Sequence, residues 1–256
     1  MTPLEAVGLA AAAAGGGVMN ALAGGGTLLT YPALLLAGET AIAANATSTV
    51  ALLPGALASV FGYRREVAEH RHWLKTLIVP SLVGGAAGSA LLLRTPERAF
   101  AALAPWLILF ATGLFMLQGA VRRGAAAGPA PAPGPGRWAA ASLAQLAVAV
   151  YGGYFGAGIG ILMLAVLGFL GLRDIHAMNG LKNFFGFCIN AVAASYFVWR
   201  GAVNPEAAAV MIAGAIAGGY AGARFARWIG PERARAAVIV VGLLTTALLL
   251  AQRWAS

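Results

Sequence analysis

Two short polar motifs, each beginning with an asparagine, interrupt an otherwise apolar sequence and hold the side chains best suited to bind a ligand. The first is Asn45-Ala-Thr-Ser-Thr49, and the second is Asn179-Gly-Leu-Lys-Asn183. Because Asn, Ser and Thr are preferred N-cap residues, each motif predicts the start of a helix. Backbone N–H groups and the positive end of a helix dipole would then lie beside side-chain donors, an arrangement that favours a bound anion.

The two asparagine motifs lie 134 residues apart, and other parts of the sequence repeat at the same distance. A glycine motif precedes each of them, Gly24-Gly-Gly26 before the first and Gly158-Ile-Gly160 before the second. Further on, the glycines at 84, 85 and 88 fall in register with those at 218, 219 and 222. The chain is therefore predicted to be a duplication, with a first transmembrane repeat at 1–123, a Pro/Ala/Gly linker at 124–136 and a second repeat at 137–256.

The composition predicts that the protein lies in a membrane. Of the 256 residues, 60% are hydrophobic and only 10% are charged, and the mean hydropathy is +0.81, so one soluble core could not hide the apolar surface. Apolar runs that equal or approach the ~20 residues needed to cross a bilayer occur at 4–37, 40–63, 76–93, 99–121, 138–172, 177–199, 205–223 and 236–252. The predicted fold class is an all-α integral membrane protein with two homologous repeats of about four helical segments each.

The first apolar run, 4–37, is too long for one straight crossing, because a continuous helix would extend ~50 Å through a hydrocarbon core of ~30 Å. It contains two glycine triplets. For Gly15–Gly17 we expect close helix packing through small residues. For Gly24–Gly26, repeated at Gly158 and Gly160, we expect a broken helix that lines a cavity, because lipid cannot satisfy a freed backbone.

The relative orientation of the repeats depends on how many times each crosses the membrane. Four crossings per repeat would make the repeats parallel, with a weak excess of basic residues inside. If the segment from the glycine break to about residue 62 re-enters as a hairpin, the repeats invert and the inside excess grows, as the positive-inside rule favours. The length of 45–62, ~27 Å as a helix, favours a full crossing instead. Both arrangements stay open.

The charged residues argue against nucleic-acid binding and against an enzyme. The net charge is +9, but the basic residues lie at predicted helix ends and loops, where cytoplasmic orientation and anionic lipid headgroups account for them. No HExxH, GxSxG or paired-carboxylate motif is present, and Cys188 is a single cysteine, so no catalytic residue, metal or cofactor is predicted. Lys182 is the candidate charge within an apolar segment, where it either balances an anion or extends to the membrane interface.

Taken in order, the glycine and asparagine motifs resemble the sulfite exporter TauE/SafE family. The resemblance covers nearly the whole chain apart from 124–136 and rests on GGGTLLTYP (24–32), ANATST (44–49), GYRR (62–65), GIG (158–160) and NGLKN (179–183). It implies a multi-pass permease of the bacterial inner membrane with seven or eight spans. Its substrates would be small sulfur-containing anions such as sulfite or organosulfonates, or other small organic anions.

We hypothesise a secondary transporter, an exporter of such anions, in which the two motifs face each other across a cavity and access alternates by rocking of the repeats. The candidate substrate-binding residues are Gly24, Gly25, Gly26, Asn45, Thr47, Ser48, Thr49, Gly158, Gly160, Asn179, Lys182 and Asn183. The expected partners are a small anion and the lipid bilayer, with a homo-oligomer left open. The alternatives are a carrier of other small organic anions, a proton-coupled cation carrier and a non-transporting accessory membrane protein.

Overall fold

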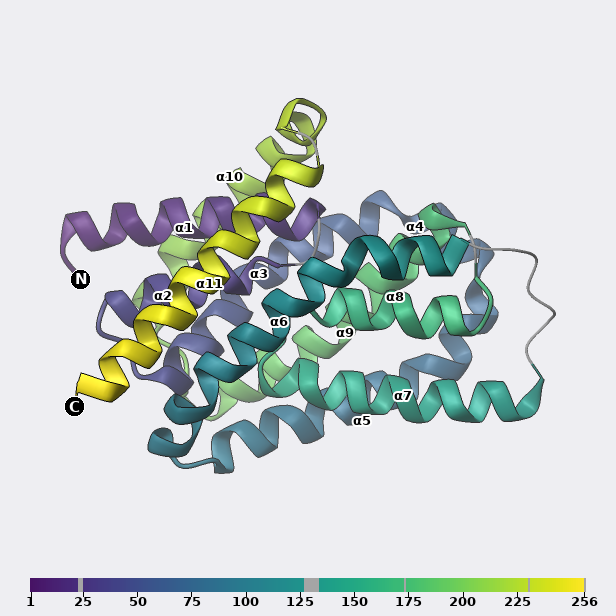
Figure 1. Cartoon of the computed structure of the whole chain (residues 1–256), viewed down its shortest axis with the longest axis horizontal. Coiled ribbons are helices and arrows are strands. Elements are labelled where there is room, and N and C mark those ends of the chain that lie inside the picture. The colour runs from purple at the N-terminus through teal and green to yellow at the C-terminus, as the bar shows by residue number, and fades with distance from the viewer. Residues whose placement is uncertain (23–24, 127–133, 173, 230, 256) are drawn as a thin grey trace.

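Helices form the whole of the described secondary structure (Figure 1). The computed structural model describes residues 1–22, 25–126, 134–172, 174–229 and 231–255. Within these ranges it has no strand and consists of α1 (Pro3–Leu22), α2 (Thr27–Leu36), α3 (Ala41–Gly62), α4 (Arg64–Glu69), α5 (Arg71–Arg94), α6 (Glu97–Ala126), α7 (Pro135–Tyr154), α8 (Ile159–Phe169), α9 (Ile175–Trp199), α10 (Pro205–Ile229) and α11 (Pro231–Ala255). The expectation of an all-α protein is confirmed.

Several of these helices have the length and composition of membrane spans. Among the described residues, four helical segments are long and apolar enough to cross a bilayer: Ala41–Gly62, Arg71–Arg94, Glu97–Leu117 and His176–Trp199. Shorter apolar helices cover Thr27–Leu36, Ile159–Phe169, Pro205–Gly219 and Ala236–Ala251. Large apolar side chains on α6, such as Trp106, Phe110 and Leu117, are exposed, as the lipid-facing surface of a membrane protein requires.

The long helices α3 and α9 begin before the asparagine motifs, so the prediction that Asn45 and Asn179 cap them is wrong. The Thr40 side chain caps α3, and the Glu97 carboxylate reaches across from α6 to accept hydrogen bonds from the first backbone N–H groups of α3. Asp174 caps α9. Each asparagine lies about one turn inside its helix, where its side chain can face neighbouring helices.

Two helix pairs, α1 with α10 and α5 with α7, pack closely through small residues. A Cβ atom added at Gly17 on α1 would overlap the carbonyl oxygen of Ala215 on α10, and one added at Gly88 on α5 would overlap that of Val150 on α7. Because α1 continues through Gly15–Gly17 without a break, the expected close packing of this triplet is confirmed.

Figure 1 shows both chain termini at one end of the molecule, which we name the terminal end. The opposite end holds the 63–71 segment and the start of α7, and we name it the basic end after Arg64, Arg65 and Arg71. The N-terminus and the start of α7 therefore lie at opposite ends, as inverted repeats would require. The segment from the glycine break to residue 62 consists of α2 and α3, which pack against each other across a short loop, and α3 alone is long and apolar enough to cross a bilayer.

Helices α7 and α8 form a hairpin whose open end lies at the basic end. The Arg137 guanidinium at the start of α7 donates a hydrogen bond to the carbonyl oxygen of Phe169 at the end of α8. The turn between the two helices contains Gly156 and Gly158 with φ of 84° and 79°, a conformation that glycine adopts without strain. At the start of α2, the Gly26 N–H donates to the Asn20 side chain of α1 at 3.1 Å, so these two helices are also joined at their junction.

The close packing at Gly88 predicts a specific loss of stability. Gly88→Ala is expected to lower the melting temperature of the purified protein in detergent, because the new methyl group overlaps the Val150 carbonyl at a cost of roughly 1–3 kcal/mol. Gly113→Ala on α6 is the matched control, since nothing lies within 4 Å of its added Cβ and alanine favours a helix. Equal melting temperatures for the two variants would contradict the packing described here.

Candidate functional site

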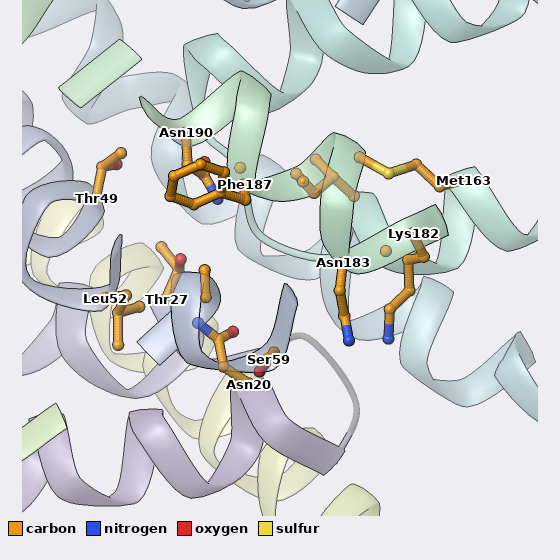
Figure 2. A pocket seen from close by; sticks show the side chains of 15 residues that line it. Asn20, Thr27, Thr49, Leu52, Ser59, Met163, Lys182, Asn183, Phe187 and Asn190 are labelled. Atoms are coloured by element: carbon orange, nitrogen blue, oxygen red, sulfur yellow. The ribbon is translucent and has the colours of Figure 1, made fainter. Parts of the chain in front are cut away.

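A cavity of about 70 Å³ lies between α3 and α9 and extends to the starts of α2 and α8 (Figure 2). By the measure in which one water needs roughly 10–15 Å³, it holds about five waters, the space of a small solute. The residues that line it are Asn20, Thr27, Thr49, Leu52, Ala56, Ser59, Gly156, Ile159, Gly160, Met163, Lys182, Asn183, Gly186, Phe187 and Asn190.

One face of α3 and one face of α9 form the main walls of the cavity. On each helix the lining residues recur every three or four positions, the spacing of one helical face. The two faces also match at the 134-residue distance found in the sequence: the pairs are Thr49 with Asn183, Leu52 with Gly186, and Ala56 with Asn190. The cavity therefore lies between faces of α3 and α9 whose lining positions are related by the 134-residue distance.

The short helices α2 and α8 both begin at the cavity. Thr27 is the first residue of α2, and Ile159 and Gly160 are the first two of α8. The first four N–H groups of a helix have no partner within the helix, and its N-terminus carries a partial positive charge. Two helix N-termini thus direct positive potential into one small space.

Side-chain donors add to this potential. Among the described residues that line the cavity, Lys182 is the only charged one, and it is 7% exposed. Figure 2 shows Lys182 and Asn183 extending in the same direction, with Asn190 further along α9 and Asn20 contributed by α1. Amide and ammonium groups donate hydrogen bonds, so these four side chains suit an anion or another acceptor-rich ligand.

Gly160 makes room for the Lys182 side chain. A Cβ atom added at Gly160 would lie 3.1 Å from Lys182 Cδ and 3.6 Å from its Cγ, closer than ordinary van der Waals contact for the first of these atoms. The aliphatic part of Lys182 therefore crosses the start of α8 directly over the glycine. This contact explains in physical terms why a glycine suits this position of the GIG motif.

The structure brings Thr49, Gly160, Lys182 and Asn183 of the predicted site residues together around the cavity. Three residues of the first motif instead bond to neighbouring segments. Asn45 Nδ2 donates to the Tyr154 carbonyl at 3.1 Å. Thr47 Oγ1 accepts from the Asn204 N–H at 3.0 Å, and the Ser48 and Thr30 hydroxyls are 2.5 Å apart.

The other predicted residues that the structure describes do not line the cavity. Gly25 packs against the Phe115 ring, Gly26 against Gly16, and Gly158 against Ala111 and Leu114. Asn179 is half-buried on α9. Gly24 lies outside the described residues.

Several lining residues were missed by the sequence reasoning, among them Asn20, Thr27, Ser59 and Asn190. Asn190 lies two turns after Asn183 on α9, so helical spacing from the second motif could have found it. Asn20 comes from α1, and no spacing rule relates it to either motif.

The fold and the cavity define a class, a polytopic α-helical membrane protein with a polar site between its helices. Residues 9–249 match the family described as "Sulfite exporter TauE/SafE". Since this match covers most of the chain, the protein belongs to that family and is a membrane transporter, as the resemblance of its motifs had implied.

Two relatives support the same class. A "Probable membrane transporter protein" of Haemophilus influenzae is 28% identical over 231 residues, which are 90% of this chain and 88% of the relative. A "Probable membrane transporter protein ORF9" of Sinorhizobium sp. is 25% identical over 240 residues, 92% of this chain and 88% of the relative. No solved structure matches the chain.

Adjacent positions on α3 test the geometry of the cavity. In a chain with Cys188→Ala, Thr49→Cys is expected to react with a small water-soluble thiol reagent, because Thr49 lines the cavity. Ser48→Cys is the control and is expected to stay unmodified in the folded protein, because Ser48 is fully buried against Thr30. The labelled fraction is measured by mass spectrometry over time. Faster labelling at position 48 than at position 49 would place the cavity on another face of α3.

Proposed function

We propose that this protein is a secondary transporter, an exporter of small sulfur-containing anions such as sulfite or organosulfonates, across the bacterial inner membrane. The observation that carries the proposal is the convergence of two helix N-termini, those of α2 and α8, on a cavity that contains Lys182. Half-helices that begin inside a membrane transporter direct their positive ends at anionic substrates. We choose a sulfur oxyanion as the substrate because the family description names sulfite.

The chemistry of the lining supports an anion more strongly than a cation. A lysine inside a membrane protein is costly unless it faces a cavity, a partner or a substrate. No aspartate or glutamate is among the described residues that line the cavity, so a bound cation would lack the carboxylate that cation and proton sites usually contain. Donors from Asn20, Asn183 and Asn190 suit the several oxygen atoms of a sulfite or sulfonate group.

Apolar residues in the cavity wall suit substrates that have a short hydrocarbon portion. Leu52, Ile159, Met163 and Phe187 form part of the cavity wall, and such a surface suits a short hydrocarbon portion of a substrate. An organosulfonate has this portion, and so does a small carboxylate. Competition of labelled sulfite uptake by methanesulfonate and by acetate separates the two classes, because a sulfur-specific site is blocked only by the first.

We further propose that residues 1–123 and 137–256 act as two inverted repeats whose relative rocking alternates access to the cavity. The reciprocal packing supports this arrangement: α1 packs on α10 as α5 does on α7, and α3 packs on α9. The basic end would face the cytoplasm under the positive-inside rule, since Arg64, Arg65 and Arg71 lie there.

Removal of the Lys182 charge tests the proposed site. In proteoliposomes, Lys182→Ala is expected to reduce saturable uptake of labelled sulfite at low concentration by roughly ten- to hundredfold, the effect of losing a charged hydrogen bond. Lys75→Ala is the matched control, because Lys75 is exposed on α5 near the basic end, and its uptake should equal wild type. Unchanged uptake by Lys182→Ala would move the site elsewhere. Folded wild-type protein that transports no small anion would contradict the proposed substrate class.

Gly160→Ala tests the contact between α8 and the lysine. The added methyl group is expected to displace the Lys182 stem and to reduce uptake roughly tenfold, because small misplacements of a positioned group have large effects. Gly8→Ala is the control, since nothing lies within 4 Å of its added Cβ. The double variant Gly160→Ala/Lys182→Ala should be no worse than Lys182→Ala alone, because both changes act on one side chain. Additive losses would show that Gly160 acts independently of Lys182.

A further inference from the structure

Asn204, which precedes α10, joins three segments at the terminal end of the molecule. Its backbone N–H donates to Thr47 Oγ1 on α3 at 3.0 Å, and its Nδ2 donates to Glu39 Oε1, in the loop before α3, at 2.5 Å. Its Oδ1 accepts from the N–H groups of Glu206 and Ala207 and so caps α10. One residue thus connects the α9–α10 loop to the start of α3.

These bonds lie between the cavity and the terminal end. Along α3 the cavity lining begins at Thr49 and continues to Ser59, towards the basic end. Thr47 is two residues nearer the terminal end and fully buried, as is Ser48, while Asn45 is 1% exposed. Asn45 also bonds to the end of α7 through the Tyr154 carbonyl. This part of α3 is therefore enclosed where the cavity stops.

The corresponding place at the basic end is built differently. The positions related to Thr47 and Asn204 by the 134-residue distance are Leu181 and His70. Leu181 has no hydroxyl group to accept a hydrogen bond. His70 Nδ1 lies 2.9 Å from the Glu66 carbonyl, within its own segment. The polar connection between α3 and the α9–α10 loop therefore has no chemical equivalent at these two positions.

We propose that Glu39, Thr47 and Asn204 form a latch that closes the cavity towards the terminal end and opens when the cavity exchanges its contents with that side. The latch rests on the cavity assigned under the proposed function. Its bonds join separate segments across a boundary that the substrate must cross. Since each is a hydrogen bond between neutral or singly charged groups, the set can break and re-form in a transport cycle.

The chemistry of Asn204 allows a variant that opens the latch without removing the helix cap. In Asn204→Asp, a carboxylate oxygen still accepts from the first N–H groups of α10, because aspartate is a preferred N-cap residue. The Nδ2 donor is lost, and two carboxylates then face each other at positions 39 and 204. The second variant, Asn204→Asp with Glu39→Gln, restores one donor and one acceptor with their roles exchanged. Thr47→Val removes the other hydrogen bond of the latch, the one from the Asn204 N–H to Thr47 Oγ1, with little change in side-chain shape.

The experiment measures access to the cavity from each side of the membrane. Ala56→Cys, placed in a chain with Cys188→Ala, provides a thiol in the cavity wall. Proteoliposomes of known protein orientation are treated with a membrane-impermeant methanethiosulfonate reagent on one side at a time. When the latch residues are unchanged, we expect the reagent to modify the thiol at position 56 mainly from the basic end. Asn204→Asp and Thr47→Val should each raise the rate from the terminal end by roughly tenfold, and the double variant at 39 and 204 should return it towards the starting value.

Three results would overturn the latch. The first is equal labelling from both sides in the chain with the latch intact. The second is an unchanged rate from the terminal end in folded Asn204→Asp and Thr47→Val. The third is a parallel increase from both sides that the double variant does not reverse, which indicates general loosening. Labelling requires no substrate, so absence of anion flux would contradict the proposed function and leave this measurement interpretable.

Discussion

A helix that begins inside a bilayer leaves its first backbone N–H groups without partners, and lipid cannot supply them. The rest of this structure follows from that constraint. At the starts of α2 and α8, carbonyl groups of the preceding glycines accept from several of these N–H groups, as Gly25 does from Leu28 and Gly158 from Ile161, and the cavity between α3 and α9 borders the same helix starts. The same space then accepts Lys182, whose charge would be costly against lipid. Glycine at 160 allows the lysine stem to pass over the start of α8.

Positions that lie 134 residues apart in the chain have different surroundings. Ser48 and Lys182 lie 134 residues apart, yet Ser48 is buried in a hydrogen bond with Thr30 while Lys182 lines the cavity. Thr49 and Asn183, the next pair, both line it. On the proposed duplication, unequal side chains at equivalent positions give one site between the halves and leave its two ends free to be closed by different contacts.

Composition was sufficient to predict the helical membrane fold, and of the two asparagine motifs the structure places Thr49, Lys182 and Asn183 in the cavity wall. Composition and spacing misplaced the helix starts, because Thr40 and Asp174 cap α3 and α9 before the asparagine motifs, and at α3 the Glu97 carboxylate also reaches the helix start from α6. They also could not show that Thr49 lines the cavity and Thr47 does not. Both are threonines of one motif. Only the position of Asn204, 157 residues away in the sequence, decides that Thr47 accepts a hydrogen bond from the α9–α10 loop.

Close packing through glycine has a consequence for movement. Where Gly17 and Gly88 bring the backbones of α1 and α10, and of α5 and α7, into contact, the backbones themselves touch, while elsewhere along α5 and α7 the Trp73 and Trp138 rings pack together and Gln145 donates to Ser81. Such close backbone contacts resist separation of the paired helices, so each pair is expected to move as a unit against its neighbours. Hydrogen bonds that cross between segments, as at Asn204, then become the contacts that hold one orientation. A transporter built in this way can keep its helix pairs intact while the bonds at one end of the cavity break and re-form.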